Sequence, residues 1–308
     1  MFGNYESTLM KNKLFILVAC IFVSEVLAIF CFINHTRQID KKKIEIYVTY
    51  HKDAPLYKTD ILVPIQGGRE LHSSQGKILE TIMIGDNTGD NISELNDRYS
   101  ELTVLYWIWK NSKADYVGLM HYRRFLNLAH DDHNFTNHDK FLYYGFTYQN
   151  ITKLMQDADI IVARPEALNV GKNLYEHYAK HHFKQDIDAI ILYAKKKDMK
   201  TGQALDFYFH HADEYNPRNI FIAKKEVIDA YCAWLFDILA KTDDKLKTNH
   251  LLMNTSYKWS PSNWDYQKRS PGFISERLFS FWVNFHKHEY KVIEKPFILT
   301  ETCNKIYI

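Results

Sequence analysis

The sequence predicts an α/β protein in which helices flank a mostly parallel central sheet. Short, continuous apolar runs such as "YVGLM" at 116–120 and "DIIVA" at 159–163 are typical of parallel strands covered on both faces. These runs alternate with longer segments of helical periodicity, as βαβ units do. A chain of 308 residues with 46% hydrophobic and 15% aromatic residues has ample material for a packed core.

The charge balance excludes a general affinity for nucleic acid. The net charge is +2, from 39 basic and 37 acidic residues, so an anion site must come from a local cluster. The four cysteines show neither a disulfide framework nor the spacing of a metal site. We therefore expect no nucleic-acid partner and no cysteine-bound metal.

Residues 14–33 form an apolar run with Glu25 as its one charge. About 20 such residues cross a bilayer as a helix, and one acid costs about 3 kcal/mol, which the apolar neighbours outweigh. We predict a tail at 1–13, a single-pass membrane anchor at 14–33, a basic linker at 34–43 and one domain at 44–308. A cleaved signal peptide and, less favoured, a buried core helix remain alternatives.

Lysine and arginine are more frequent after this segment than before it. By the positive-inside rule, this asymmetry favours a cytoplasmic domain carboxyl-terminal to the anchor. The residues concerned are Lys11 and Lys13 before the span, and Arg37, Lys41, Lys42 and Lys43 after it.

The first predicted strand, "IEIYV" at 44–48, is followed by the polar residues Thr49, His51 and Lys52. No glycine-rich dinucleotide or P-loop motif follows, so neither of those nucleotide sites is supported. Further on, the loop around Asp86 and Asp90 suits either a divalent cation or, as we favour, a solvated turn that caps the next helix through Ser93 or Asn96.

The stretch 91–125 combines an aromatic helix, a buried strand and a cluster of cations. Apolar side chains at 102, 105, 106 and 109 fill one helical face, and further aromatic residues widen it, which indicates a core helix covered on more than one side. The strand "YVGLM" leads to His121, Tyr122, Arg123 and Arg124. Ligands of open α/β sheets bind beyond the carboxyl ends of strands, so we expect the chemistry here.

The later segments continue the alternation. A helix is predicted over 173–198, a strand at 219–225 with a long amphipathic helix after it, and a final helix after "SPGF", with Glu276 and Arg277 in its first turn beside Lys268 and Arg269. His177 and His181 are spaced for a metal or phosphate, and a second histidine-rich loop spans 130–138. For both we favour ordinary structural roles.

Three blocks together resemble a known family: "ELTVLYWIWKN" followed by "YVGLMHYRR", then "LYEHYAKHH", then "YQKRSPGFISERLFSFW". In this order they resemble a glycosyltransferase-like family of bacterial capsule and lipopolysaccharide gene clusters, catalogued as a domain of unknown function of the DUF4422 type. The likeness covers about 44–299. It implies a GT-A-like domain that uses a nucleotide sugar, and a divalent cation (Mn²⁺ or Mg²⁺) as the one cofactor to consider.

One departure bears on that cation. Most GT-A enzymes carry an Asp-x-Asp motif that holds a metal on the diphosphate, and this chain has none at the end of "DYVGLMHYRRF". Positive side chains offer a substitute, because the leaving diphosphate gains negative charge in the transition state. Arg123 and Arg124 are suited to bind it, although an ion pair with an acid at the sheet rim is an equal alternative. If the strand continues through them, they face opposite sides and His121 shares the face of Arg123.

These considerations give a candidate site. We expect Glu276 to deprotonate the acceptor hydroxyl, with Asp265 and Glu101 as rivals, and His121 to take part in catalysis. The expected substrate-binding residues are Thr49, His51, Lys52, Arg123, Arg124, Arg269 and Arg277.

The leading hypothesis is a membrane-anchored bacterial glycosyltransferase with its catalytic domain in the cytoplasm. It would transfer a sugar, with galactose in one of its ring forms as the expected donor sugar, to a lipid-linked or polysaccharide acceptor. Two alternatives are a non-catalytic sugar-binding protein that assembles polysaccharide enzymes, and a metal-dependent hydrolase that uses the histidine-rich segments.

Overall fold

The computed structural model describes residues 22–27, 41–71, 82–128, 145–253 and 266–300. The chain divides into two compact units, Met1–Lys42 and Lys43–Ile308. In the first unit, residues 22–27 are helical, and the rest of the predicted anchor lies outside the described residues. Within the described ranges, we find no helix that combines the length and apolar character needed to span a membrane.

The second unit is built on one large sheet. In the described part of this unit, the sheet has the strand order β10-β6-β9-β4-β1-β2-β3, and β5 and β11 extend it beside β4. The strands are β1 (Ile44–Tyr50), β2 (Leu62–Gln66), β3 (Ile84–Gly85), β4 (Tyr116–His121), β5 (Arg124–Leu126), β6 (Ile160–Ala163), β9 (Phe221–Lys224), β10 (Val292–Lys295) and β11 (Phe297–Leu299).

The sheet is mostly parallel, as predicted. Strands β3, β2, β1 and β4 run in one direction, and β6 and β10 are parallel to each other. The strand predicted at 219–225 is β9, which is antiparallel to both β4 and β6. At the centre, Gly118 of β4 has no side chain where a Cβ would lie 2.9 Å from the Phe221 carbonyl oxygen, so β4 and β9 can approach closely.

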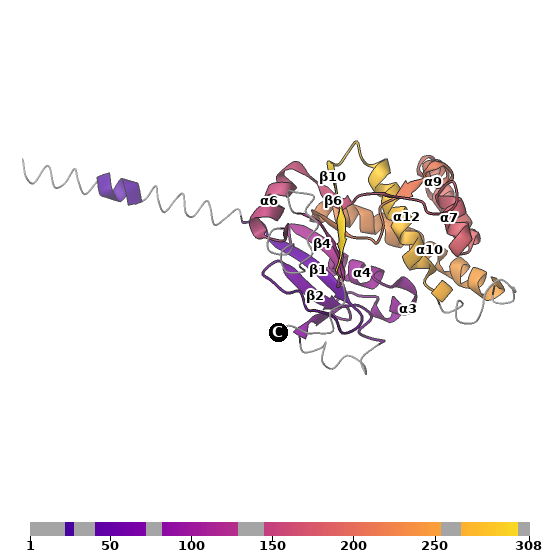
Figure 1. Cartoon of the computed structure of the whole chain (residues 1–308), viewed down its shortest axis with the longest axis horizontal. Coiled ribbons are helices and arrows are strands. Elements are labelled where there is room, and N and C mark those ends of the chain that lie inside the picture. The colour runs from indigo at the N-terminus through magenta and orange to yellow at the C-terminus, as the bar shows by residue number, and fades with distance from the viewer. Residues whose placement is uncertain (1–21, 28–40, 72–81, 129–144, 254–265, 301–308) are drawn as a thin grey trace, which may run out of the picture. The chain divides into compact units, whose positions relative to one another are not determined.

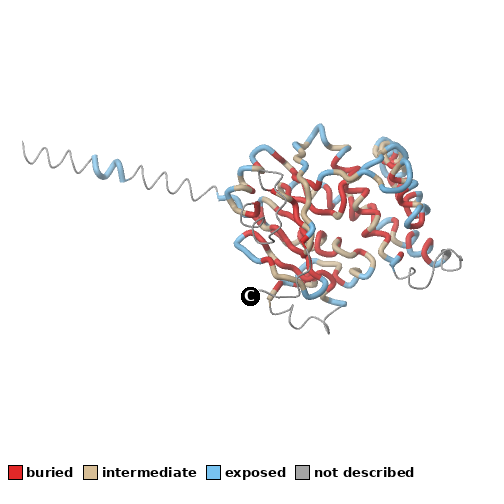
Figure 2. The backbone as a smooth tube through the Cα atoms, in the orientation of Figure 1, coloured by how far each residue is buried: buried red, intermediate tan, exposed pale blue. Residues whose placement is uncertain are grey.

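Helices cover both faces of this sheet. Alternate side chains of each central strand enter two separate cores, as the two-residue period of a strand requires. One core contains α4 (Leu102–Asn111), α10 (Lys225–Met253) and α12 (Ser270–Phe285), and the other contains α6 (Tyr148–Asp157). Figure 1 shows α6 on one side of the strands and the other three helices on the opposite side, and Figure 2 shows the buried strands between them.

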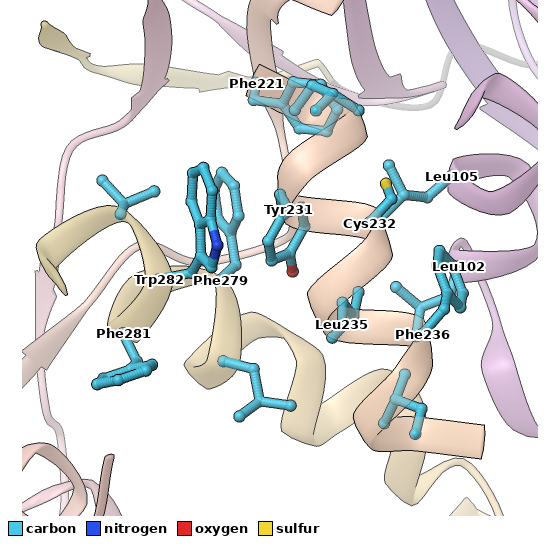
Figure 3. Packing of buried hydrophobic residues seen from close by; sticks show 14 of the residues in the cluster. Leu102, Leu105, Phe221, Tyr231, Cys232, Leu235, Phe236, Phe279, Phe281 and Trp282 are labelled. Atoms are coloured by element: carbon cyan, nitrogen blue, oxygen red, sulfur yellow. The ribbon is translucent and has the colours of Figure 1, made fainter. Parts of the chain in front are cut away.

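The aromatic helix α4 is a core helix with contacts on two sides. Trp107 meets Tyr47 of β1 edge to face, with ring centroids 5.6 Å apart, and Trp109 stacks on Phe236 of α10 at 5.7 Å. In Figure 3, Leu102 and Leu105 lie against α10, whose Tyr231 packs toward Phe279 and Trp282 of α12. The prediction of a helix covered on more than one side is confirmed.

The strand through the arginines is interrupted. Strand β4 ends at His121, Tyr122 and Arg123 form a turn, and β5 returns antiparallel so that Arg124 pairs with His121. The pairing of β5 with β11 and the hydrogen bond from the Thr300 amide to the Arg123 carbonyl oxygen stabilise this return. The condition for Arg123 and Arg124 to face opposite sides, a strand that continues through both, is therefore not met.

Two helix boundaries also differ from the sequence prediction. The helix expected over 173–198 is two helices, α7 (Leu174–His181) and α8 (Lys184–Lys197), because His182 and Phe183 are extended and buried between them. The last helix begins at Ser270 with Pro271 in its first turn, a position that proline favours. Glu276 and Arg277 consequently lie in its second turn, so the prediction of the first turn is wrong.

Smaller elements complete the unit. A 3-10 turn η1 (Ser93–Leu95) and α3 (Asn96–Tyr99) precede α4, and α9 (Met199–His211) packs on α8. Strands β7 (Glu166–Ala167) and β8 (Glu214–Tyr215) form a separate two-stranded ribbon. These pieces bring α7, α12 and the start of α4 to the end of the sheet at which β1 and β4 terminate.

Candidate active site

A cavity of about 850 Å³ lies at the carboxyl ends of β1, β2 and β4. The strand ends and the α3 region form one part of its wall, and α7 with the start of α12 forms another. Its lining residues are Thr49, His51, Gly67, Asn96, Asp97, Ser100, Glu101, His121, Tyr122, Arg123, Arg124, His177, Lys180, His181, His182, Tyr215, Tyr266, Gln267, Arg269, Gly272, Phe273, Glu276 and Arg277. The position is the one expected for ligands of α/β sheets.

The two adjacent arginines both reach this cavity. Burial lowers the pKa of Arg124, and the neighbouring Arg123 and Arg218 cations lower it further. Within the described part of the chain, the buried Nε atoms of Arg123 and Arg124 have no hydrogen-bond partner. Among the described residues, no acid lies within ion-pair distance of either guanidinium, although the negative charges of Glu276 and Glu101 act on Arg124.

The residues at and just after the end of β1 lie at the same end of the cavity. Thr49 and His51 line it, and the His51 ring packs on Tyr122 with centroids 5.2 Å apart. Desolvation and the nearby Lys52 and Arg269 cations lower the pKa of His51 to about 4. Lys52 itself does not line the cavity. Its Nζ lies 5.8 Å from the centre of the ring of Tyr122, a residue that does line it. It contributes charge rather than a direct wall contact.

His121 is buried at the end of β4, and its tautomer is fixed. Its Nε2 lies 2.9 Å from the Arg218 carbonyl oxygen, which can only accept, so Nε2 carries the proton. Burial lowers the pKa of His121, which keeps the ring neutral. Nδ1 is then an acceptor.

Two carboxylates lie among these cations. Burial raises the pKa of Glu276, and the charge of Glu101 raises it as well, while Arg277 and the Arg218 backbone N–H oppose the rise. Glu101, at the start of α4, accepts a hydrogen bond of 2.8 Å from Asn219 Nδ2. Asp265, the other predicted rival for the base, lies outside the described residues.

Arg277 and Arg269 both line the cavity but are held differently. Arg277 is buried and donates to the Phe273 carbonyl oxygen at 2.6 Å and to His177 Nδ1 at 3.0 Å. Arg269 donates through Nε to Ser100 Oγ at 2.8 Å, which leaves its outer nitrogens for other partners. Arg277 thus organises the wall, and Arg269 is the better placed of the two for a ligand.

The paired histidines of α7 have structural partners. His177 accepts from Arg277 at Nδ1 and donates through Nε2 to Asn169 Oδ1 at 3.2 Å, so both nitrogens are used. Burial, with Arg277 close by, lowers its pKa to about 4. Among the described residues there is no group of three or more histidine, cysteine or acidic side chains suited to a metal. The predicted loop at 130–138 lies outside those residues.

The metal implied by the GT-A resemblance does not fit the end of β4. Mn²⁺ and Mg²⁺ take oxygen ligands, and Arg123 and Arg124 follow β4, where the GT-A resemblance would require an Asp-x-Asp motif. We therefore derive no step through a metal.

Asp86 belongs to the scaffold behind this site. It is fully buried and accepts hydrogen bonds from the Gly68 and Arg69 amides and from the hydroxyls of Ser93 and Thr103. Neither a cation site nor a solvated turn describes it. The helix cap predicted from Ser93 or Asn96 is also wrong, because η1 and α3 have no side-chain cap bond.

A family model described as "Domain of unknown function (DUF4422)" matches residues 45–288. The chain belongs to this family. That match confirms the resemblance drawn from the three sequence blocks. No curated protein matches the chain.

Among solved structures, this DUF4422 chain is similar to one described as "WbbM bifunctional glycosyltransferase apo structure". The two share 27% sequence identity with a TM-score of 0.72, over 86% of this chain and 48% of that one. The chain therefore spans about half the length of the protein that it matches.

Most of the predicted site residues meet in one cavity, with Lys52 just outside its wall. The contributions of Tyr266, Gln267 and Phe273 were missed, because they depend on how α12 meets α7. The sequence predicts a loop at Asn216 and Pro217, but the contacts that the following Arg218 and Asn219 make with the site were missed.

Proposed function

We propose that the DUF4422 domain is a glycosyltransferase. It transfers a sugar, galactose in its pyranose or furanose form, from a nucleotide-sugar donor to a lipid-linked or polysaccharide acceptor. The observation that carries this proposal is the cavity in which Arg123 and Arg124 stand with the carboxylates Glu101 and Glu276. The similarity to a protein described as a bifunctional glycosyltransferase supports it.

In the proposed reaction, the arginines stabilise the diphosphate as the glycosidic bond breaks. Positive groups fixed in advance at a developing charge lower the barrier without further reorganisation. Arg123 and Arg124 are suited to this role, since the backbone turn after β4 places both at the cavity and their buried Nε atoms have no hydrogen-bond partner among the described residues. Arg269 adds a further positive charge to the cavity wall.

Glu276 is the proposed base for the acceptor hydroxyl. A base works best when its pKa lies near the operating pH, and burial moves the pKa of Glu276 upward from 4.5. His121 and Thr49, beside the strand ends, are proposed to orient the substrates. We further propose that the chain is anchored in a bacterial membrane by residues 14–33, with the domain on the cytoplasmic side.

The test is turnover of nucleotide sugars by the purified full-length chain. Uridine, guanosine and cytidine diphosphate sugars are offered with and without an acceptor glycan, and release of nucleoside diphosphate is measured. We expect turnover of at least one donor, and Arg124→Ala should lower kcat/KM about 100-fold. Lys113→Ala, which removes an exposed cation near the opposite end of β4, is the matched control.

Two results would overturn the proposal. One is a folded chain that binds and turns over none of these donors. The other is a donor that binds but is never consumed, together with polymer synthesis in cells that is insensitive to Arg124→Ala. The second result would favour the non-catalytic assembly protein. Repeating the turnover assay with a chelator tests the dependence on Mn²⁺ or Mg²⁺.

A further inference from the structure

Two consecutive residues before β9 have a left-handed backbone. The φ angles of Arg218 and Asn219 are 73° and 50°, and neither residue is glycine. Such conformations cost free energy and persist where the surrounding contacts determine them, often at functional sites. The contacts of this turn are therefore informative about the site.

The backbone of the turn reaches two predicted catalytic residues. The Arg218 carbonyl oxygen accepts the His121 Nε2 hydrogen bond at 2.9 Å, and the Arg218 backbone N–H lies near the Glu276 carboxylate, whose pKa it lowers. One peptide segment thus connects the end of β4 with the second turn of α12.

The side chain of the next residue reaches a third element. Asn219 is 2% exposed, and its Nδ2 lies 2.8 Å from Glu101 Oε1 and 2.8 Å from Ser275 Oγ. Ser275 donates its own proton to the Gly272 carbonyl oxygen, so it accepts from Asn219. Both amide protons are therefore committed, one of them to the carboxylate.

The orientation of this amide is fixed by chemistry. An ionised carboxylate only accepts, so a flipped amide would place an oxygen against Glu101. In the orientation present, Asn219 Oδ1 is buried without a hydrogen-bond partner among the described residues. A buried, unpartnered oxygen disfavours folding, so stability alone does not explain an asparagine here.

We propose that Asn219 is a positioning residue that holds the Glu101 carboxylate facing the cavity beside Glu276. The turn thereby fixes His121, Glu101 and Glu276, which come from three separate elements, in one arrangement around the acceptor hydroxyl. This role rests on the proposed glycosyltransferase function.

The left-handed backbone of Asn219 allows a substitution that removes the side chain without straining the turn. Glycine adopts a φ of 50° without strain, so Asn219→Gly removes the amide while the turn keeps its conformation. In the full-length chain, we expect kcat for donor turnover to fall about 100-fold while KM changes less than about twofold, because misplacement of a catalytic group affects turnover more than binding.

A second measurement does not depend on activity. Crystal structures of the wild type and Asn219→Gly compare the position of the Glu101 carboxylate, which should leave its wild-type position once the 2.8 Å hydrogen bond from Asn219 Nδ2 is lost. If glycine prevents folding, Asn219→Ala removes the same donor and should displace the carboxylate in the same way.

The two readouts separate the possible failures. If the wild-type chain turns over no donor, the glycosyltransferase proposal fails, and the position of the Glu101 carboxylate in the two structures still decides the role of Asn219. An unchanged position of that carboxylate, or a kcat that Asn219→Gly leaves intact, overturns the positioning role.

Discussion

At the scale of single residues, burial acts in opposite directions on the two kinds of titratable side chain that line the cavity. It disfavours the charged form of each, so the pKa of Glu276 rises while that of His182 falls to about 3. The same desolvation thus prepares a carboxylate to take a proton and keeps a histidine neutral beside Arg277. The cavity keeps arginine and lysine as its permanent cations.

The lowered pKa of His182 predicts how stability depends on pH. Between pH 6.5 and about 3, the unfolded chain binds a proton at this position that the folded chain does not, so the free energy of unfolding falls as the pH falls through this window. Urea unfolding at several pH values should show a shallower decline for His182→Gln than for the wild type. Gln185→Ala, which changes an exposed side chain of α8 that does not titrate, should keep the wild-type decline. Equal declines for wild type and His182→Gln would contradict the prediction.

At the scale of elements, the Asp86 carboxylate joins the segment after β2 to η1 and α4. Four donors from these segments converge on it. Asp86→Ala leaves them buried without an acceptor and should lower the free energy of unfolding by about 3 kcal/mol, as measured by urea denaturation.

Asp90→Ala is the matched control for that change. Asp90 is exposed, and its carboxylate accepts a hydrogen bond from the Tyr106 hydroxyl at 3.1 Å. Its removal should cost less than about 1 kcal/mol. Comparable losses of unfolding free energy in the two variants would show that the Asp86 carboxylate does not hold these segments together.

The packing of α9 on α8 gives another prediction at this scale. A Cβ at Gly202 would lie 2.5 Å from the Lys195 Cα, a backbone atom that no rotamer change can move. Alanine gains about 1 kcal/mol of helix propensity over glycine, but overpacking of this kind costs about 1–3 kcal/mol. We expect Gly202→Ala to destabilise the chain in thermal unfolding. The exposed Gln203→Ala should leave stability within about 0.5 kcal/mol, and a stabilised Gly202→Ala would contradict the close packing.

At the scale of the whole molecule, the second unit contains the sheet, both cores and the cavity. Its first strand is tied in from Lys43, whose amide donates to Asp115 Oδ2 at 2.8 Å. A fragment that begins at Lys41 should therefore unfold at the same urea concentration as the full chain. A fragment that begins at Val48 loses half of β1, at the centre of the sheet, and should not fold. A large loss of stability in the longer fragment would show that residues before Lys41 support the domain.

Much of the architecture could be predicted from the sequence because it depends on local periodicity. The apolar runs at 116–120 and 159–163 are strands β4 and β6, and the aromatic pattern at 102–109 is the core helix α4. The family followed from blocks of sequence, and it was confirmed. The site was predicted to lie beyond the carboxyl end of the strand at 116–120, because ligands of open α/β sheets bind there.

The sequence by itself thus determined the α/β class, the family and the arginines after β4. Only the tertiary structure decided that β9 is antiparallel, that β4 turns back at Tyr122, and that Glu101 and Glu276 share a cavity with those arginines. The physical reason is the range of the interactions. Periodicity reports which face of an element is buried, whereas strand direction, the turn and the Asn219 contacts depend on distant partners, such as Glu101, which is 118 positions from Asn219 along the chain.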